Sequence, residues 1–311
     1  MAGPGWTSWR PLALARGLSS SALAEQLDGG QSFRWVEHAP GEWTGVFGRH
    51  VARLRASGGT VEWSGLAGDV ATEPALLNYL DAAGEQERLA DGLPWRSDPV
   101  LRAAMAVHPG LRILRQDPSE ALLCFLCSSN KRIQQIRSMV AALSRGFGPP
   151  LGAGHTALPS WADLARAQEK ELRACALGYR AAYVRGVALR LASSPDWADG
   201  WSRLETPALL ERLRSLPGVG PKVAACVALF GFARLECFPV DTWIVQALAS
   251  AYGLGGWDAA RMEMFGRVHF GPAAGLAQQH LFAAARAGRL PGLSDGGARA
   301  PRPRSRARRR R

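Results

Sequence analysis

The spacing of apolar residues changes near residue 73, and this change limits the folds open to the chain. Residues 30–66 alternate between apolar and polar with period two, interrupted by turn sequences at Ala39-Pro40-Gly41 and Ser57-Gly58-Gly59-Thr60. Such alternation predicts an antiparallel sheet with one face in water. Beyond residue 73 apolar residues recur at helical spacing. We therefore expect an α+β fold, with an N-terminal antiparallel β-sheet domain followed by a mainly α-helical body.

Three regions follow from these patterns: a β-rich N-terminal domain at 1–115, a helical body at 116–290, and a disordered Arg-rich tail at 291–311. Asp117-Pro118-Ser119-Glu120 begins the first helix of the body, with an acceptor cap followed by proline. A second helix carries Ile133, Ile136 and Leu143 at helical spacing. Further helices are predicted at 160–175, 180–193, 207–215, 221–231, 242–252, 258–268 and 273–287.

Positive charge is concentrated at the C-terminus. The segment Arg299–Arg311 holds eight arginines and no acidic residue, and it accounts for eight of the 12 net positive charges. We expect it to be disordered and to bind polyanions non-specifically. No apolar run approaches the ~20 residues of a membrane span. A secretory signal is not expected, because residues 1–16 lack a continuous apolar core.

The five cysteines favour reduced thiols in a cytosol, because their number is odd in a chain of this size. Cys124 and Cys127 have the spacing of zinc and redox sites, but no second pair of cysteines or histidines completes a zinc site. The spacing of a four-cysteine iron–sulfur cluster is also absent. Because Cys124 and Cys127 lie in an apolar helical stretch, we expect them to pack in the core.

Residues 207–231 predict a helix-hairpin-helix. Two apolar stripes are expected to pack on each other: Leu209, Leu210, Leu213 and Leu216 on the first helix, and Val223, Val227 and Phe230 on the second. Gly218 and Gly220 allow the turn and leave backbone N–H groups bare at the start of the second helix. A helix N-terminus binds phosphate well. The turn is therefore predicted to clamp DNA backbone, with a purely structural connection as the alternative.

Lys222 follows this turn and is one of only three lysines among 38 basic side chains. A lysine amine can be deprotonated and attack carbon, whereas arginine is a poor nucleophile. Asp241 comes next in Pro239-Val240-Asp241 and is expected to cap the helix 242–252. Lys222 and Asp241 have two interpretations. In the first, Lys222 contacts a phosphate and Asp241 only caps a helix. In the second, the Lys222 amine and the Asp241 carboxylate act together on a sugar carbon in DNA.

The segment Leu216–Asp241 resembles the helix-hairpin-helix, Gly/Pro-rich, aspartate signature of base-excision DNA glycosylases. Further segments are similar to the 8-oxoguanine DNA glycosylase/AP lyase family: Gly30-Gln31-Ser32-Phe33-Arg34-Trp35, Leu114-Arg115-Gln116-Asp117-Pro118, Cys127-Ser128-Ser129-Asn130, Leu177-Gly178-Tyr179-Arg180, and Ala277-Gln278 with Leu281-Phe282. The resemblance spans roughly residues 20–287. It implies a bifunctional enzyme of base excision repair that excises 8-oxoguanine from duplex DNA.

In that family the lesion nucleotide is flipped out of the duplex into a pocket. Gly30 matches the glycine whose carbonyl accepts the N7–H that 8-oxoguanine has and guanine lacks. Cys226 and Phe282 match the residues on the two faces of the flipped base, and Gln278 matches the amide on its Watson–Crick edge. From the residues alone, Gly30 is equally a turn glycine, and Cys226 and Phe282 are core residues.

The resemblance also implies contacts to the rest of the duplex. Asn130 matches the residue that fills the vacated space, Tyr179 matches the wedge beside it, and Arg180 matches an arginine that reads the orphaned cytosine.

Three positions depart from the family pattern. Gln135 stands where a second cytosine-reading arginine is often found, so a strict preference for cytosine opposite the lesion does not follow. Trp243 replaces a histidine near the catalytic aspartate that helps hold the DNA backbone. Lys131 stands where the family tends to have a neutral polar residue, and it is expected to contact phosphate.

The implied mechanism needs no metal or organic cofactor. Asp241 stabilises positive charge on the deoxyribose, Lys222 attacks C1′ to form a Schiff base, and β-elimination nicks the strand. The hairpin carbonyls are candidates for holding a monovalent cation that bridges to phosphate.

The expected partner is double-stranded DNA containing oxidised guanine. The protein is expected to act as a monomer and not to associate with a membrane. The expected location is the cytoplasm or nucleoid of a bacterium, or the nucleus of a eukaryote. Two alternatives stay open: a helix-hairpin-helix glycosylase for another damaged base, and a non-catalytic DNA-binding module. Lys222 argues against monofunctional glycosylases, and the missing iron–sulfur spacing argues against adenine-specific ones.

Overall fold

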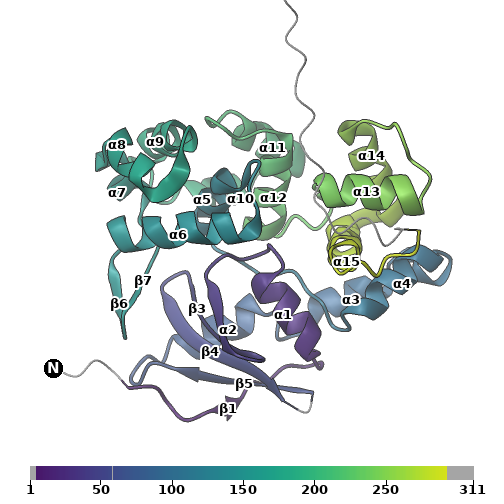
Figure 1. The fold of residues 1–311 in the computed structure, drawn as a ribbon, viewed down its shortest axis with the longest axis horizontal. Helices are drawn as coiled ribbons and strands as arrows, with labels where there is room; N and C mark the ends of the chain where they lie inside the picture. Colours follow the sequence, from purple (N-terminus) through teal and green to yellow (C-terminus); the bar gives the residue numbers. More distant parts are fainter. Residues whose placement is uncertain (1–4, 58, 293–311) are drawn as a thin grey trace, which may run out of the picture.

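The computed structural model describes residues 5–57 and 59–292. Most of the predicted Arg-rich tail, from residue 293 onward, lies outside the described residues. The N-terminal sheet lies on one side of the molecule together with α1 and α2, and most of the other helices gather on the opposite side (Figure 1). The predicted α+β class is confirmed.

The N-terminal sheet has five strands in the order β1-β5-β4-β3-β2, and each neighbouring pair is antiparallel. The strands are β1 (Arg10–Pro11), β2 (Trp35–Ala39), β3 (Glu42–Phe47), β4 (His50–Ser57) and β5 (Thr60–Gly65). The alternating segments predicted at 30–66 supply the last four, although β2 begins at Trp35 rather than at Phe33. The short edge strand β1 is not among the predicted strands, because it lies before residue 30.

One face of the sheet packs on helices α1 (Ser20–Asp28) and α2 (Thr72–Tyr79), with Trp35, Leu54 and Trp63 in the shared core. Alternate residues of β4 point to the opposite face. There the guanidinium of Arg53 lies 3.9 Å from the ring centroid of Trp6. The predicted wet face is thus partly covered by the N-terminal segment.

The helical body accounts for most of the remaining chain (Figure 1). Its helices are α3 (Glu85–Asp91), α4 (Pro99–Val107), α5 (Pro118–Ser128), α6 (Ile133–Phe147), α7 (Trp161–Arg166), α8 (Glu169–Leu172), α9 (Arg180–Leu191), α10 (Trp197–Ser202), α11 (Thr206–Arg214), α12 (Pro221–Gly231), α13 (Thr242–Ala251), α14 (Ala259–Phe270) and α15 (Ala274–Arg286). Short turns η1 (Pro94–Arg96), η2 (Arg173–Leu177) and η3 (Gly271–Ala273) and the hairpin β6 (Pro150–Gly152) with β7 (His155–Thr156) complete it.

The single helix predicted at 160–175 is wrong, because α7, α8 and the π-turn η2 divide this stretch. Ser160 and Asp163 form a capping box at the start of α7, and the Glu171 side chain accepts from the Gln168 backbone N–H at the start of α8. Two helix starts so close together require an extended residue between them, and Ala167 supplies it.

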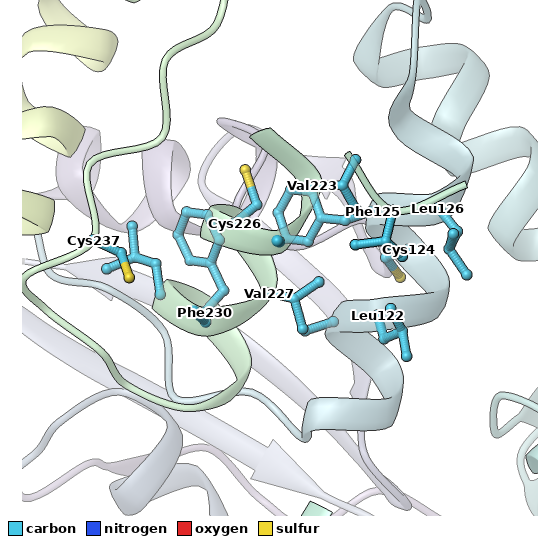
Figure 2. Packing of buried hydrophobic residues seen from close by; sticks show 14 of the residues in the cluster. Leu122, Cys124, Phe125, Leu126, Val223, Cys226, Val227, Phe230 and Cys237 are labelled. Carbon is cyan, nitrogen blue, oxygen red and sulfur yellow. The ribbon is translucent and has the colours of Figure 1, made fainter. Parts of the chain in front are cut away.

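Helices α5 and α12 pack side by side in the centre of the body (Figure 2). The rings of Phe125 and Phe230 stack between them, with centroids 5.3 Å apart. Cys124 and Cys127 are buried on α5 as free thiols, so the prediction of core packing is confirmed. Helix α12 is thereby held against α5, and its first turn carries Lys222.

Helix α4 packs on α15 and contributes Leu101 and Ala104 to the core of the helical body. Residues before 115 therefore support the helix that carries Gln278 and Phe282. The division of the chain into domains at residue 115 stays a prediction.

Candidate active site

The predicted helix-hairpin-helix is formed by α11, a tight turn and α12. Gly218 has φ +77°, and a Cβ there would lie 2.5 Å from the ring of Tyr183. Both facts restrict the position to glycine. Gly220 is the N-cap of α12 in an extended conformation, with Pro221 in the first turn. Within the described residues no side chain caps this end, so its amide groups are available to an anion.

Lys222 is half-buried in the first turn of α12. Its Nζ lies 5.4 Å from the centroid of the Phe125 ring, which forms one wall around the amine. Burial raises the pKa of the Cys226 thiol one turn further along, while the positive charge of Lys222 acts in the opposite direction. The amine therefore faces an apolar wall and a buried thiol.

Asp241 begins α13, and its Oδ1 accepts a hydrogen bond from the Ile244 backbone N–H at 2.9 Å. The predicted capping role is confirmed. Burial raises the pKa of Asp241, and the amide of Ile244 and the charge of Lys222 oppose that rise. The charge of Lys222 thus reaches the Asp241 carboxyl, and a catalytic role for the two residues stays a prediction.

Gly30 lies directly after α1 with φ +103°, and a Cβ at this position would be 3.3 Å from Cδ1 of Ile133. The neighbouring Gln31 fixes this loop, since its side chain donates to the carbonyl of Arg112 and accepts from the amide of Leu114. The Gln116 amide then donates to the Gln31 carbonyl at 2.8 Å. Gln31 and Gln116 belong to the segments that resemble the family, although the sequence alone predicts no role for them. Their bonds show that they hold the Gly30 loop in place.

Gln278 and Phe282 lie four residues apart on α15 and therefore share one face of that helix. Gln278 is buried, and its Nε2 donates to the Pro239 carbonyl at 3.0 Å. Phe282 is half-buried against the main core, and Cys226 is buried on α12. A recognition role for these three residues stays a prediction.

Asn130 and Tyr179 are exposed at the surface of the helical body. Asn130 lies between α5 and α6 with φ +54°, a conformation that asparagine adopts more readily than most residues. Tyr179 precedes α9 and is 49% exposed. Lys131, next to Asn130, is half-buried.

Arg180 lies inside the protein, although it is predicted to read an orphaned cytosine. It is 3% exposed, and its guanidinium donates to the carbonyls of Leu177 and Ser129. The same group lies 4.4 Å from the centroid of the Tyr179 ring. In this structure Arg180 therefore supports Tyr179 and the Asn130 loop rather than facing solvent.

Two of the three departures from the family pattern, Gln135 and Trp243, have local roles. The Gln135 side chain accepts a hydrogen bond from the Arg132 backbone N–H at 3.1 Å at the start of α6. Trp243 lies in the first turn of α13 and packs against the main core.

Within residues 5–57 and 59–292, no cluster of three or more His, Cys, Asp or Glu side chains is arranged to hold a metal ion. None of the helices in the described part of the chain combines the length and apolarity needed to cross a membrane.

Comparison with known proteins decides the family. Residues 14–122 match the family model of the 8-oxoguanine DNA glycosylase N-terminal domain. The N-glycosylase/DNA lyase OGG1 of Arabidopsis thaliana is 34% identical over 299 residues, which cover 90% of this chain and 81% of that protein. The chain belongs to the 8-oxoguanine DNA glycosylase family. It is a DNA N-glycosylase with lyase activity.

Solved structures of the family have the same fold. The apo-form of the Clostridium acetobutylicum 8-oxoguanine glycosylase/lyase aligns with a TM-score of 0.77 at 31% identity, covering 84% of this chain and 92% of that one. The same glycosylase in complex with DNA containing cytosine opposite 8-oxoguanine aligns with a TM-score of 0.80 at 28% identity, covering 91% of this chain and 98% of that one.

Proposed function

We propose that this glycosylase excises 8-oxoguanine from duplex DNA and cleaves the strand at the resulting abasic site, with Lys222 as nucleophile and Asp241 as the charge-stabilising group. The observation that carries this proposal is the position of Lys222, half-buried in the first turn after the hairpin with its Nζ 5.4 Å from the Phe125 ring centroid, where its charge opposes the rise that burial causes in the pKa of the Asp241 carboxyl. Charges interact more strongly there than in water.

The reaction needs both groups at one sugar. As the glycosidic bond breaks, positive charge develops on the deoxyribose, and the Asp241 carboxylate stabilises it. The Lys222 amine forms a bond to C1′ while the base leaves with the bonding electrons and takes up a proton. Loss of a proton from nitrogen and opening of the sugar ring then give the Schiff base. Removal of a proton from C2′ expels the 3′ phosphate and nicks the strand.

Lesion recognition is proposed to rest on Gly30. The Gly30 carbonyl would accept the N7–H of 8-oxoguanine, whereas guanine would leave it without a donor, and such a mismatch discriminates strongly. Cys226 and Phe282 would enclose the base, and the Gln278 amide would bind its Watson–Crick edge. The Gln31 bonds support this assignment, because they fix the backbone that must aim the carbonyl.

The opposite strand is proposed to be handled by Asn130, Tyr179 and Arg180. To read an orphaned cytosine, Arg180 has to release the Ser129 and Leu177 carbonyls. Gln135 is engaged at the start of α6 and is not an arginine. We therefore propose that the preference for cytosine opposite the lesion is relaxed in this enzyme.

The chemistry assigned to Lys222 and Asp241 calls for no metal or organic cofactor, and the hairpin carbonyls are proposed to hold a monovalent cation on DNA binding. The enzyme is proposed to act as a monomer wherever the cell keeps its DNA.

The test is excision from a set of duplexes. Each contains 8-oxoguanine opposite one of the four bases, and controls contain undamaged guanine or an alkylated purine. We expect base release and strand cleavage from each 8-oxoguanine duplex, with modest differences among opposite bases and no release from guanine. Release of the alkylated purine in preference to 8-oxoguanine would overturn the proposed substrate.

A further inference from the structure

One stripe of helix α9 lies along the hairpin turn at residues 215–218. Gly186 approaches Pro217 so closely that a Cβ on Gly186 would lie 3.1 Å from the proline Cγ. Further along α9, the guanidinium of Arg190 donates to the Ser215 carbonyl. Tyr183, Gly186 and Arg190 are spaced by about one helical turn each and so share one face.

Tyr183 makes the tightest contact of this stripe. A Cβ on Gly218 would lie 2.5 Å from two ring carbons of Tyr183 and 2.8 Å from its Cβ, so the glycine backbone rests directly on the side chain. Tyr183 is nevertheless 39% exposed. A large aromatic residue at the surface, pressed against the apex of the phosphate-binding turn, is not explained by core packing.

The other side of Tyr183 contacts Tyr179. The two rings meet edge to face, with centroids 5.9 Å apart and planes at 80°. Arg180 lies over the Tyr179 ring and donates to the Ser129 carbonyl beside Asn130. Tyr183 is therefore in direct contact with both the hairpin apex and the wedge tyrosine.

We propose that Tyr183 is a positioning residue that couples the phosphate clamp at Gly218 to the wedge Tyr179, so that backbone binding sets the wedge for base extrusion. This inference rests on the proposed function. The edge-to-face contact holds the Tyr179 ring against displacement as the duplex opens, a step that costs a few kcal/mol. The aromatic ring carries the role, because the Tyr183 hydroxyl takes no part in these contacts.

The test compares full-length Tyr183→Ala, Tyr183→Phe and Tyr179→Ala proteins, the double Tyr179→Ala/Tyr183→Ala protein, and Leu189→Ala. Leu189 is an exposed residue on the same helix (55%) and serves as a matched control. Single-turnover base excision is measured on two duplexes. One has 8-oxoguanine paired with cytosine, and the other has it opposite an abasic analogue, where no partner base resists extrusion.

On the paired duplex we expect Tyr183→Ala to slow excision by about fivefold, near the middle of the range for an aromatic pair. On the abasic duplex the loss should be less than about twofold, which is within the scatter of a surface substitution. Tyr183→Phe and Leu189→Ala should resemble wild type. The double variant should be no slower than Tyr179→Ala alone, because coupled residues are not additive.

Equal slowing on both duplexes, or losses that multiply in the double variant, would overturn the coupling role of Tyr183 while leaving the proposed function intact. A wild-type protein inactive on both duplexes would overturn the proposed function itself, and the coupling with it. Thermal unfolding of each variant, expected within a few degrees of wild type, excludes misfolding as the cause of a loss.

Discussion

Gln278 Nε2 donates a hydrogen bond to the Pro239 carbonyl oxygen across 3.0 Å. The bond joins the helix that carries two predicted base-binding residues to the segment that ends at Asp241. The Gln278 Oε1 accepts from the Gln279 side chain at 2.6 Å, which fixes the amide orientation. The position of the base-reading amide and the position of the catalytic carboxylate are therefore linked.

Replacing Gln278 with Ala should lower both stability and excision. The substitution leaves the Pro239 carbonyl without its donor, and a buried unsatisfied polar group costs about 1–3 kcal/mol. Urea unfolding measures the loss of stability, and excision of 8-oxoguanine measures the loss of the base contact. Gln279→Ala keeps the Pro239 bond and should affect excision less. Equal losses in the two variants would contradict the link.

Two substitutions at Asp241 separate its charge from its cap. Asparagine caps a helix about as well as aspartate, so Asp241→Asn should unfold close to wild type while excision falls by roughly 10²-fold. Asp241→Ala should lose about 1 kcal/mol of stability as well. Calorimetry and single-turnover excision give the two readouts. An Asp241→Asn protein with normal excision would show that Asp241 serves only as a cap.

The two hairpin glycines offer a matched pair. Gly218 has φ +77° and lies against Tyr183, so Gly218→Ala should destabilise by about 1–3 kcal/mol and weaken DNA binding. At Gly220 the φ is −86°, and a Cβ would meet no atom of the described residues within 4 Å. Gly220→Ala should therefore unfold nearly as wild type does. Comparable destabilisation of both variants in urea would contradict this distinction.

His280 should make the protein less stable in mild acid. It is buried on α15, and burial, with a smaller contribution from nearby His108, lowers its pKa from 6.5 to about 4. Because the unfolded chain binds the proton more readily, stability is fully present above pH 6.5 and is lost as pH falls towards 4. The loss by pH 5 should be about 2 kcal/mol.

His280→Gln removes this titration and provides the control. Between pH 7.5 and pH 5 the unfolding free energy should fall by about 2 kcal/mol less in the variant than in wild type. A variant whose stability falls as steeply as that of wild type would assign the acid sensitivity to other groups.

Local sequence patterns predicted four of the strands and the starts of several helices. The period-two alternation located four strands, and the acceptor residues Asp117 and Asp241 marked two helix starts, each accepting a backbone N–H at the expected position. From the residues alone, a phosphate contact is a sufficient explanation for Lys222 and a helix cap is one for Asp241. The resemblance to the family predicted that the two residues act together in catalysis.

The remaining features depend on contacts between distant residues. Gln31 bonds to Arg112 and Leu114, and no periodicity signals a side chain that braces a segment so far along the chain. Arg180 is buried because the Ser129 carbonyl lies within reach, and that carbonyl belongs to a different loop. Arginine is usually exposed, so its burial could not be expected from its sequence neighbours.

Borohydride trapping on a duplex with one 8-oxoguanine opposite cytosine tests the central claim most directly. Lys170→Gln serves as the control, because Lys170 is an exposed lysine on α8. Wild type and Lys170→Gln should both form a covalent protein–DNA product, because reduction fixes the Schiff base at Lys222. Lys222→Gln should bind the lesion duplex but form no such product, and an undamaged guanine duplex should give none with any protein. A covalent product of normal yield from Lys222→Gln would contradict the assignment of Lys222 as the nucleophile.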